Sequence, residues 1–559
     1  MVSRRKFLGF SGLAAAWPSA AFAQQAKPKP KPEGVLVNDV HAQLNSTRVY
    51  RIVEPQSIDA VRGAMKLART EKRALCIAGG RHAMGTQQFA TDGVLLDIRK
   101  MNKVLAFDTE RGLIEMESGM QWPQLLEHLA AARFSGEKQW AFNQKQTGAD
   151  RLTMGGCLSA NIHGRGLTLP PFISDVESFT LIDAKGDLRP CSRTENADLF
   201  RLAIGGYGLF GFVYSVTLRL VPRRKLQRVV ELRTMDKIPG AFAERIRDGF
   251  LYGDFQYAID DLSPDDYLRR GVFSCYRPVA DDTPMPAAQK ELTERDWIEL
   301  LYLAHADKPA AFQRYAGHYL STNGQLYWSD EHQMSVYPEN YHRALDKRLK
   351  SEFRGTEGIT EVYCERDALP RFMAEVAQHA RREKMEIIYG TVRLIEQEKE
   401  SFLAWARKPY ACVIFNVHIE HTSRGLIRAG DQFRRLIDLG IKYGGSWYPT
   451  YHRHALRRQV DACYPQFADF LKLKRKYDPE ELFQSDWYRH SRTCSITAEP
   501  RCAATSIAAS RRARRSRAAG RRARACGGRR RPRAAWRSRP RPPWKSETRP
   551  EYRAWRCRP

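Results

Sequence analysis

Three glycine-rich loops hold the residues whose types and spacing could do chemistry. The first, at residues 77–88, reads IAGGRHAMGTQQ and lies between two predicted strands. Because glycine has no Cβ, backbone N–H groups beside it can approach and bind phosphate oxygens. Taken alone, such a loop is more often an ordinary connection between strands.

Two further loops favour an anion-binding site. Residues 153–166 read TMGGCLSANIHGRG, in which paired glycines open a turn of small residues and a histidine beside a glycine follows. Residues 205–213 read GGYGLFGFV, which brings the backbone close to a flat group before a long strand.

The sequence disfavours two other common nucleotide-binding sites and a metal site. Neither G-x-G-x-x-G followed by an acidic residue nor G-x-x-x-x-G-K-[ST] is present, which disfavours the Rossmann and P-loop interpretations. The chain has no C-x-x-C and no cluster of His and Cys at metal-ligand spacing. We therefore expect no metal site.

Short strands alternate with helices around these loops. A helix is expected from residue 58, because Ser57 can cap it and apolar residues follow at helical spacing. The expected strands are 74–78, 94–98, 113–118, 179–183 and 212–221, with a helix at 123–132. Farther along, helices are expected at 369–384 and 456–476 and a strand at 412–419. The pattern predicts an α+β domain that ends near residue 222.

Four segments in this order resemble the FAD-binding domain of the vanillyl-alcohol oxidase (PCMH-type) flavoproteins. They read AGGRHAMG, ESGMQW, LTMGGCLSANIHGRG and GGYGLFGFVYSVTLRLVP. The resemblance implies an α+β fold with a PCMH-type two-subdomain FAD-binding domain at 43–222 and an α/β substrate (cap) domain at 223–446. Residues 447–490 would then return to the flavin domain.

By this resemblance the cofactor is FAD, with the first two loops at its pyrophosphate. His82 stands where many members carry a histidine bonded covalently to the flavin, although Arg81 and Ala83 differ from the usual GGHS. A covalent bond and a noncovalent contact of His82 are both open. The expected cofactor-binding residues are Gly79, Gly80, Arg81, His82, Ala83, Met84, Gly85, Gly119, Thr153, Gly155, Gly156, Ser159, Ala160, His163, Gly164, Gly208, Gly211 and Val213.

Later segments are similar to the aldonolactone and alditol oxidases. TEVYCERDALPRFMAEV, YGTVRLIEQE, CVIFNVHIE and YGGSWYPTYHRH occur in the order seen in that group, and KYDPEELFQSDW resembles its closing segment. Arg393 and His418 match positions that face the substrate. Thr391 stands where those enzymes often have Glu, and SWYPTYH replaces a stretch that usually ends in a substrate-contacting Lys. His452 is therefore a candidate for that role.

The implied reaction is oxidation of a CH–OH group of a sugar, alditol or aldonolactone by hydride transfer to flavin N5. His418 or His452 would accept the hydroxyl proton, and Arg393 would stabilise negative charge. Each also has a structural alternative: Arg393 as a salt-bridged surface residue, and the two histidines as packing contacts. The electron acceptor is oxygen, a quinone or a protein.

Two alternatives for the whole chain remain. One is an exported carbohydrate-binding protein without catalysis, and the other is a dehydrogenase of another small substrate. A noncatalytic binder has no reason to keep three backbone loops of this kind.

The net charge of +29 does not indicate a nucleic-acid partner for the folded part. Residues 1–32 carry +6 and residues 491–559 carry +19, so the middle of the chain carries only +4. The tail from residue 491 has no Leu, Val, Phe or Met and is expected to be disordered. It is either a basic arm or a stretch translated out of frame.

Residues 1–23 have the pattern of a twin-arginine signal peptide. Arg4 and Arg5 precede a short apolar run, and Ala21-Phe22-Ala23 offers a cleavage site. The alternative is an uncleaved helix, but the run is too short to span a bilayer. Residues 24–42, with KPKPKP, are expected to be a linker. We expect a periplasmic protein, exported folded, with no stable membrane span.

Overall fold

The computed structural model describes residues 34–496, apart from 133–138, 336–337 and 339. These residues belong to one compact unit. The predicted signal peptide and the tail beyond residue 496 lie outside the described residues. Among the described residues, no helix is long and apolar enough to cross a bilayer.

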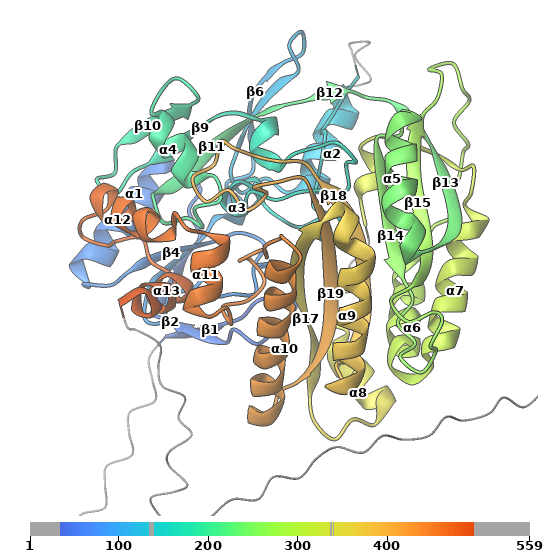
Figure 1. Ribbon diagram of the computed structural model, residues 1–559. Helices are drawn as coiled ribbons and strands as arrows, with labels where there is room; N and C mark the ends of the chain where they lie inside the picture. Colours follow the sequence, from blue (N-terminus) through green and yellow to red (C-terminus); the bar gives the residue numbers. More distant parts are fainter. Residues whose placement is uncertain (1–33, 133–138, 336–337, 339, 497–559) are drawn as a thin grey trace, which may run out of the picture. The chain divides into compact units, whose positions relative to one another are not determined.

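Two larger sheets and two two-stranded sheets, β1-β2 and β12-β8, form the described part of the chain that contains the glycine loops (Figure 1). A parallel sheet has the order β3-β5-β4, and helix α1 packs its apolar face on it. An antiparallel sheet has the order β10-β9-β11-β7-β6. The strands are β1 (Val35–Val37), β2 (Thr47–Val49), β3 (Arg51–Val53), β4 (Leu75–Ala78), β5 (Val94–Asp97), β6 (Val104–Asp108), β7 (Leu113–Glu117), β8 (Trp140–Ala141), β9 (Val176–Ile182), β10 (Leu188–Ser192), β11 (Phe212–Arg219) and β12 (Val221–Pro222).

Four helices accompany these strands. They are α1 (Ile58–Thr70), α2 (Trp122–Ala132), α3 (Met154–Ala160) and α4 (Ala197–Ala203). As expected, the Ser57 hydroxyl caps α1 by accepting from the Ala60 N–H at 3.2 Å. The expected elements of this part are all present, with ends shifted by at most three residues. The α+β class is confirmed.

The predicted linker, residues 24–42, includes residues that belong to the folded part of the chain. Strand β1 pairs with β2 from Val35 onward, so the folded part begins before residue 43. A short run of β-branched and apolar residues, VLV, is enough to add a strand here because a partner strand lies only ten residues away.

A seven-stranded antiparallel sheet dominates the rest, in the order β16-β13-β15-β14-β18-β19-β17. Its strands are β13 (Lys225–Thr234), β14 (Tyr252–Tyr257), β15 (Arg270–Pro278), β16 (Leu326–Trp328), β17 (Gly355–Glu365), β18 (Ile387–Ile395) and β19 (Tyr410–Glu420). We call this part the cap. The division at residue 222 stays a prediction, although the change from one sheet to the next falls there.

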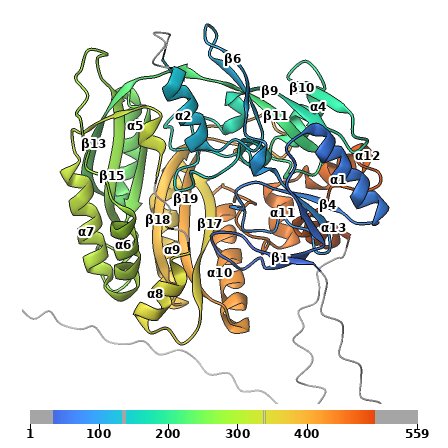
Figure 2. The same ribbon diagram turned by 180° about the vertical axis from the view of Figure 1, so that it is seen from behind.

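Six helices belong to the cap (Figure 1 and Figure 2). They are α5 (Ile238–Arg247), α6 (Glu294–Ala306), α7 (Lys308–Ser321), α8 (His342–Leu349), α9 (Leu369–Arg382) and α10 (Ser423–Lys442). In both views α6 and α7 lie toward the β13 end of the sheet, and α10 lies toward the β17 end.

The last segment runs back to the first sheet. The Leu75 N–H donates to the Leu482 carbonyl at 2.7 Å, and the Gln484 N–H donates to the Leu75 carbonyl at 3.0 Å. Within this segment Lys474 and Asp478 form an ion pair that is fully buried. Its helices are α11 (Arg457–Cys463), α12 (Phe467–Tyr477) and α13 (Asp486–Ile496).

Two sequence predictions for this segment are wrong. The single helix expected at 456–476 is split into α11 and α12, because Pro465 has no N–H to continue α11. The disordered tail was expected from residue 491, but α13 continues to Ile496. Arg492 supports this extension through an ion pair with Glu481 at 2.8 Å.

Candidate functional site

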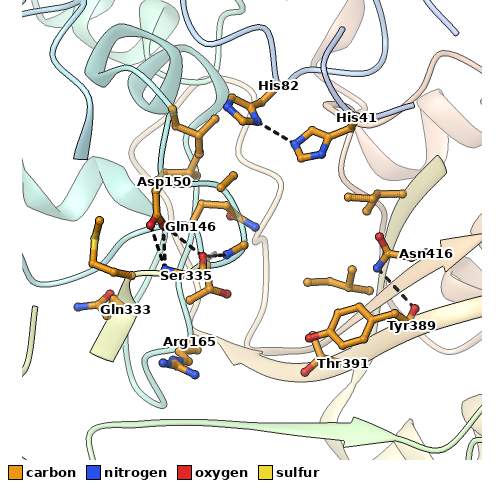
Figure 3. A pocket seen from close by; sticks show the side chains of 18 of the residues that line it. His41, His82, Gln146, Asp150, Arg165, Gln333, Ser335, Tyr389, Thr391 and Asn416 are labelled. Atoms are coloured by element: carbon orange, nitrogen blue, oxygen red, sulfur yellow. Dashed lines mark hydrogen bonds between the residues drawn. The ribbon is translucent and has the colours of Figure 1, made fainter. Parts of the chain in front are cut away.

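A cavity of about 780 Å³ lies between the glycine loops and the sheet of the cap. Figure 3 shows His41 and His82 on one side of it and Tyr389, Thr391 and Asn416 across from them. Successive strand residues point to opposite faces, so alternate residues of β18 and β19 reach the same space. The cavity therefore joins the loops of one part of the chain to one face of the cap sheet.

An ion pair between Arg81 and Asp97 fixes the position of the first glycine loop. Arg81 has a positive φ of 59°, and its guanidinium bonds the Asp97 carboxylate at 2.9 Å. Arg99 bonds the same carboxylate at 2.6 Å. Burial alone would raise the pKa of Asp97, but the hydrogen bond and charge of Arg99 and the charge of Arg81 lower it. Arg81 thus fixes the loop through Asp97.

The loop leaves donors for an anionic ligand. The N–H groups of residues 80–83 donate no hydrogen bond to any part of the chain that the structure describes, and all four residues line the cavity. A Cβ on Gly80 would lie 2.1 Å from the Arg151 carbonyl oxygen, and one on Gly79 would lie 2.0 Å from Thr153 Oγ1. The two loops are therefore packed as closely as glycine allows, and their free N–H groups suit a diphosphate.

The second loop is a short capped helix. Thr153 Oγ1 accepts from the Gly156 N–H at 3.3 Å, and Asn161 ends α3 in the left-handed conformation with φ of 46°. In the third loop Gly211 has φ of 148°, and a Cβ there would lie 2.5 Å from the Ile182 carbonyl oxygen. Both loops bring backbone to the cavity wall.

Most of the expected cofactor-binding residues line this cavity. Those that do are Gly79, Gly80, Arg81, His82, Ala83, Thr153, Gly155, Gly156, Ser159, Ala160, Gly208, Gly211 and Val213. Those that do not are Met84, Gly85, Gly119, His163 and Gly164. Gly119 instead permits backbone packing, since a Cβ there would lie 2.0 Å from the Ile98 carbonyl oxygen.

His163 is turned toward the cap. Its Nε2 lies 2.8 Å from Glu361 Oε1, and both side chains are buried. Tyr363 donates a hydrogen bond to the same oxygen. Burial would raise the pKa of Glu361, but the charge and hydrogen bond of His163, the bond from Tyr363 and the charge of Arg393 lower it. His163 therefore joins the second glycine loop to β17.

Arg393 is the one expected catalytic residue that the structure brings to the cavity. Its side chain is buried, and its Nη2 donates to Thr147 Oγ1. Its Nε and Nη1 are buried without a hydrogen-bond partner. A surface salt bridge, the structural alternative, does not describe this residue, because Arg393 is buried and lines the cavity.

The structure brings neither expected histidine to the cavity. His418 lies near the end of β19, where its Nδ1 is 3.4 Å from Glu357 Oε1. Burial would lower the pKa of His418, but the hydrogen bond and charge of Glu357 raise it. His452 is stacked between Phe433, at 4.8 Å, and Trp447, at 5.4 Å. Its Nε2 lies 3.1 Å from Thr360 Oγ1, and burial holds its pKa well below the usual value.

Several polar residues of the cavity escaped the sequence analysis. Buried side-chain atoms without a hydrogen-bond partner are Gln88 Oε1, Gln146 Oε1, Arg165 Nε, Gln256 Oε1 and both ring nitrogens of His332. Tyr389 and Asn416 also line the cavity. Strand alternation from Arg393 could have found Tyr389, but Arg165 lies in a loop and His332 in a three-residue 3-10 helix, where no such pattern applies.

His41 was also missed, because it fell in the predicted linker. Its Nε2 lies 2.8 Å from His82 Nδ1. Burial, together with the charge of Lys145, lowers the pKa of His82 to about 4. His82 is therefore a neutral imidazole at the cavity wall at neutral pH.

Residues 50–192 match a family model described as an FAD binding domain. The protein is an FAD-binding flavoprotein. This match covers the strands and the first two glycine loops that form one wall of the cavity. The expected cofactor is thereby confirmed.

Several relatives of this flavoprotein are named as sugar-lactone enzymes. It is 29% identical to L-gulonolactone oxidase of Bos taurus over 189 residues, 33% of this chain and 40% of the relative. It is 28% identical to L-galactono-1,4-lactone dehydrogenase 1, mitochondrial, of Oryza sativa subsp. japonica over 236 residues, 40% of this chain and 39% of the relative.

A third relative matches over a longer range. L-gulono-1,4-lactone dehydrogenase of Mycobacterium tuberculosis (strain ATCC 25618 / H37Rv) is 24% identical over 443 residues, 78% of this chain and 95% of the relative. For the first relatives, by contrast, the match spans about two fifths of their length. These relatives are named as oxidases or dehydrogenases of sugar lactones, and the matches support the resemblance to aldonolactone oxidoreductases.

The close packing of the two glycine loops predicts the effect of one methyl group. Gly80→Ala should lower the ratio of bound flavin to protein, because the new Cβ would displace either the Arg151 carbonyl or the loop N–H groups. Gly63→Ala is the matched control, since a Cβ there meets nothing within 4 Å. Flavin absorbance relative to protein absorbance measures occupancy. Equal occupancy in the two variants would contradict the assignment of the loop.

Proposed function

We propose that this flavoprotein oxidises a CH–OH group of an aldonolactone, sugar or alditol. The observation that carries the proposal is the set of buried, unpartnered polar atoms in the cavity. Arg393 and Arg165 contribute donors, while Gln146 and Gln256 contribute acceptors. A hydroxyl group both donates and accepts, so a polyhydroxylated ligand would satisfy both kinds of atom.

The residues of the chain would bind and orient such a substrate. Bound FAD supplies the acceptor for a hydride, at flavin N5. Arg393 would hold the oxygen of the reacting group with its free Nε and Nη1 and stabilise negative charge there. Gln256 donates to the Tyr389 hydroxyl at 2.8 Å, and burial raises the pKa of Tyr389. Tyr389 therefore remains a neutral hydrogen-bonding group.

His418 and His452 take no step in this proposal, because neither lines the cavity. The hydroxyl proton would pass to a water molecule. The electron acceptor is oxygen, a quinone or a protein, and the relatives include enzymes named as oxidases and as dehydrogenases. A carbohydrate-binding protein without catalysis is the second candidate. Its cavity would bind the same ligands, but bound FAD would stay oxidised in their presence.

Anaerobic mixing with aldonolactones, sugars and alditols tests the proposal. At least one should bleach the flavin, and Arg393→Met should lower kcat/KM for that compound by about 100-fold or more, because a charged donor to the reacting oxygen is lost. Arg382→Met, on the exposed side of α9, is the matched control. Flavin that no compound reduces would favour the binding protein, and reoxidation by air separates an oxidase from a dehydrogenase.

We also propose that His82 bonds the flavin covalently. A ring nitrogen would form a bond to a ring-methyl carbon, which would lose a proton, while the electron pair would pass into the flavin and from there to the electron acceptor of the enzyme. A neutral imidazole can offer a nitrogen lone pair, and the low pKa of His82 keeps it neutral. After acid precipitation the yellow colour should stay with the polypeptide, and His82→Ala should release it. His128→Ala, on α2 and outside the cavity lining, should retain it. Release of the flavin from the unmodified protein would instead establish a noncovalent contact.

We also propose that the protein is exported to the periplasm as a folded protein. It rests on the twin-arginine pattern and the Ala21-Phe22-Ala23 cleavage site. A protein that binds its cofactor before export suits this route. N-terminal sequencing of the protein from the periplasm should start at Gln24, and a protein found only in the cytoplasm with its N-terminus intact would contradict export.

A further inference from the structure

A cluster of histidine and glutamate side chains lies at the edge of the cap, beyond the cavity. A nitrogen of His305, a nitrogen of His418 and a carboxylate oxygen of Glu386 all lie within 4.8 Å of one another. They come from the end of α6, the end of β19 and the residue before β18. Three elements far apart in the sequence thus bring three potential ligands to one place.

We propose that His305, His418 and Glu386 bind a divalent first-row transition metal ion, such as Zn²⁺. Two imidazoles and one carboxylate form a donor set that zinc and iron sites use, with the remaining positions open to water. The rings of His305 and His418 are nearly perpendicular, at 87°, with centroids 4.8 Å apart. Two nitrogens can therefore approach one ion without the rings clashing.

Glu357 supplies the outer contacts that such a site needs. Its Oε1 lies 3.3 Å from His305 Nε2 and 3.4 Å from His418 Nδ1. Histidines that bind metals usually donate their other N–H to a carboxylate, which fixes the tautomer and the ring orientation. With Nδ1 of His418 directed to Glu357, its Nε2 is left for the ion.

A third histidine, His342, also lies against Glu357. His342 Nδ1 lies 3.0 Å from Glu357 Oε2, yet neither of its ring nitrogens has a partner with hydrogen-bond geometry. Its side chain is 3% exposed. Three imidazoles thus gather on one buried carboxylate, an arrangement that an ion would make favourable.

The ion would have a path from solvent. Glu386 is exposed, while the side chains of His305 and His418 are 8% and 15% exposed. Neither histidine lines the flavin cavity, whereas Glu357 does. The site is therefore separate from the proposed reaction centre and shares one residue, Glu357, with the cavity wall.

Titration of the tag-free, EDTA-treated holoprotein with Zn²⁺ tests the proposal. We expect one ion per chain, and Glu386→Gln should weaken its binding by at least about tenfold. Glu383→Gln is the matched control, because Glu383 is an exposed carboxylate three residues earlier that bonds Arg382 instead. Both substitutions lie on the surface, so neither should alter folding.

Co²⁺ gives a second readout. Its visible d–d bands report coordination by nitrogen and oxygen, and they should appear on addition of one equivalent and disappear in His305→Gln. Fewer than one bound ion per chain, or equal Zn²⁺ affinities of Glu386→Gln and the unmodified protein, would overturn the proposal and leave a histidine–carboxylate network without metal. Flavin reduction is not part of these measurements, so their outcome is independent of the proposed oxidation.

Discussion

The buried contact between His163 and Glu361 sets the distance between the two walls of the cavity. Charged and polar groups taken out of water are costly unless their geometry is well satisfied, so such a pair tolerates little displacement. His163 lies three residues after the helix of the second glycine loop, and Glu361 lies on β17 of the cap sheet. The loops that suit the FAD diphosphate and the strands that face them are thereby held in one arrangement.

A second ion pair, between a buried lysine and a partly buried aspartate, strengthens this arrangement. Lys145 is fully buried and bonds Asp150 at 2.6 Å, while the Ser335 N–H donates to the same carboxylate at 3.0 Å. Ser335 belongs to the cap, and the 145–150 segment precedes the second glycine loop. Burial lowers the pKa of Lys145, and Asp150 opposes that effect. The positive charge of Lys145 in turn lowers the pKa of His82 and helps to keep that histidine neutral.

The charge of Arg393 is tolerated because of the same framework. A buried guanidinium needs a negative neighbour, and the charge of Arg393 lowers the pKa of Glu361. Glu361 thus serves both His163 and Arg393. Glu361 lies on β17, two strands from Arg393 on β18 with β19 between them, and the Nε and Nη1 of Arg393 remain free for a ligand.

Local signals explain what the sequence could predict. Glycine spacing located the first two phosphate-facing loops, because close backbone approach depends on a few adjacent residues. Arg393 followed from the resemblance of YGTVRLIEQE to the aldonolactone and alditol oxidases. His418 shares a face with Asn416 on β19, but it lies two residues farther along, or about 7 Å, which places it beyond the cavity. His452 depends on stacking between Phe433 and Trp447, a tertiary contact that no local pattern reveals.

One face of the cap sheet therefore carries two kinds of polar site. Around Arg393 the unpartnered atoms are donors and acceptors of different residues that face an enclosed volume, which suits an organic ligand. Around Glu357 they are imidazoles gathered on one carboxylate close to solvent, which suits an ion. Spacing along the chain could not predict the second site, because residues 305, 386 and 418 meet only when α6, β18 and β19 pack together. His418, expected at the flavin, is thus better explained by the chemistry of its actual neighbours.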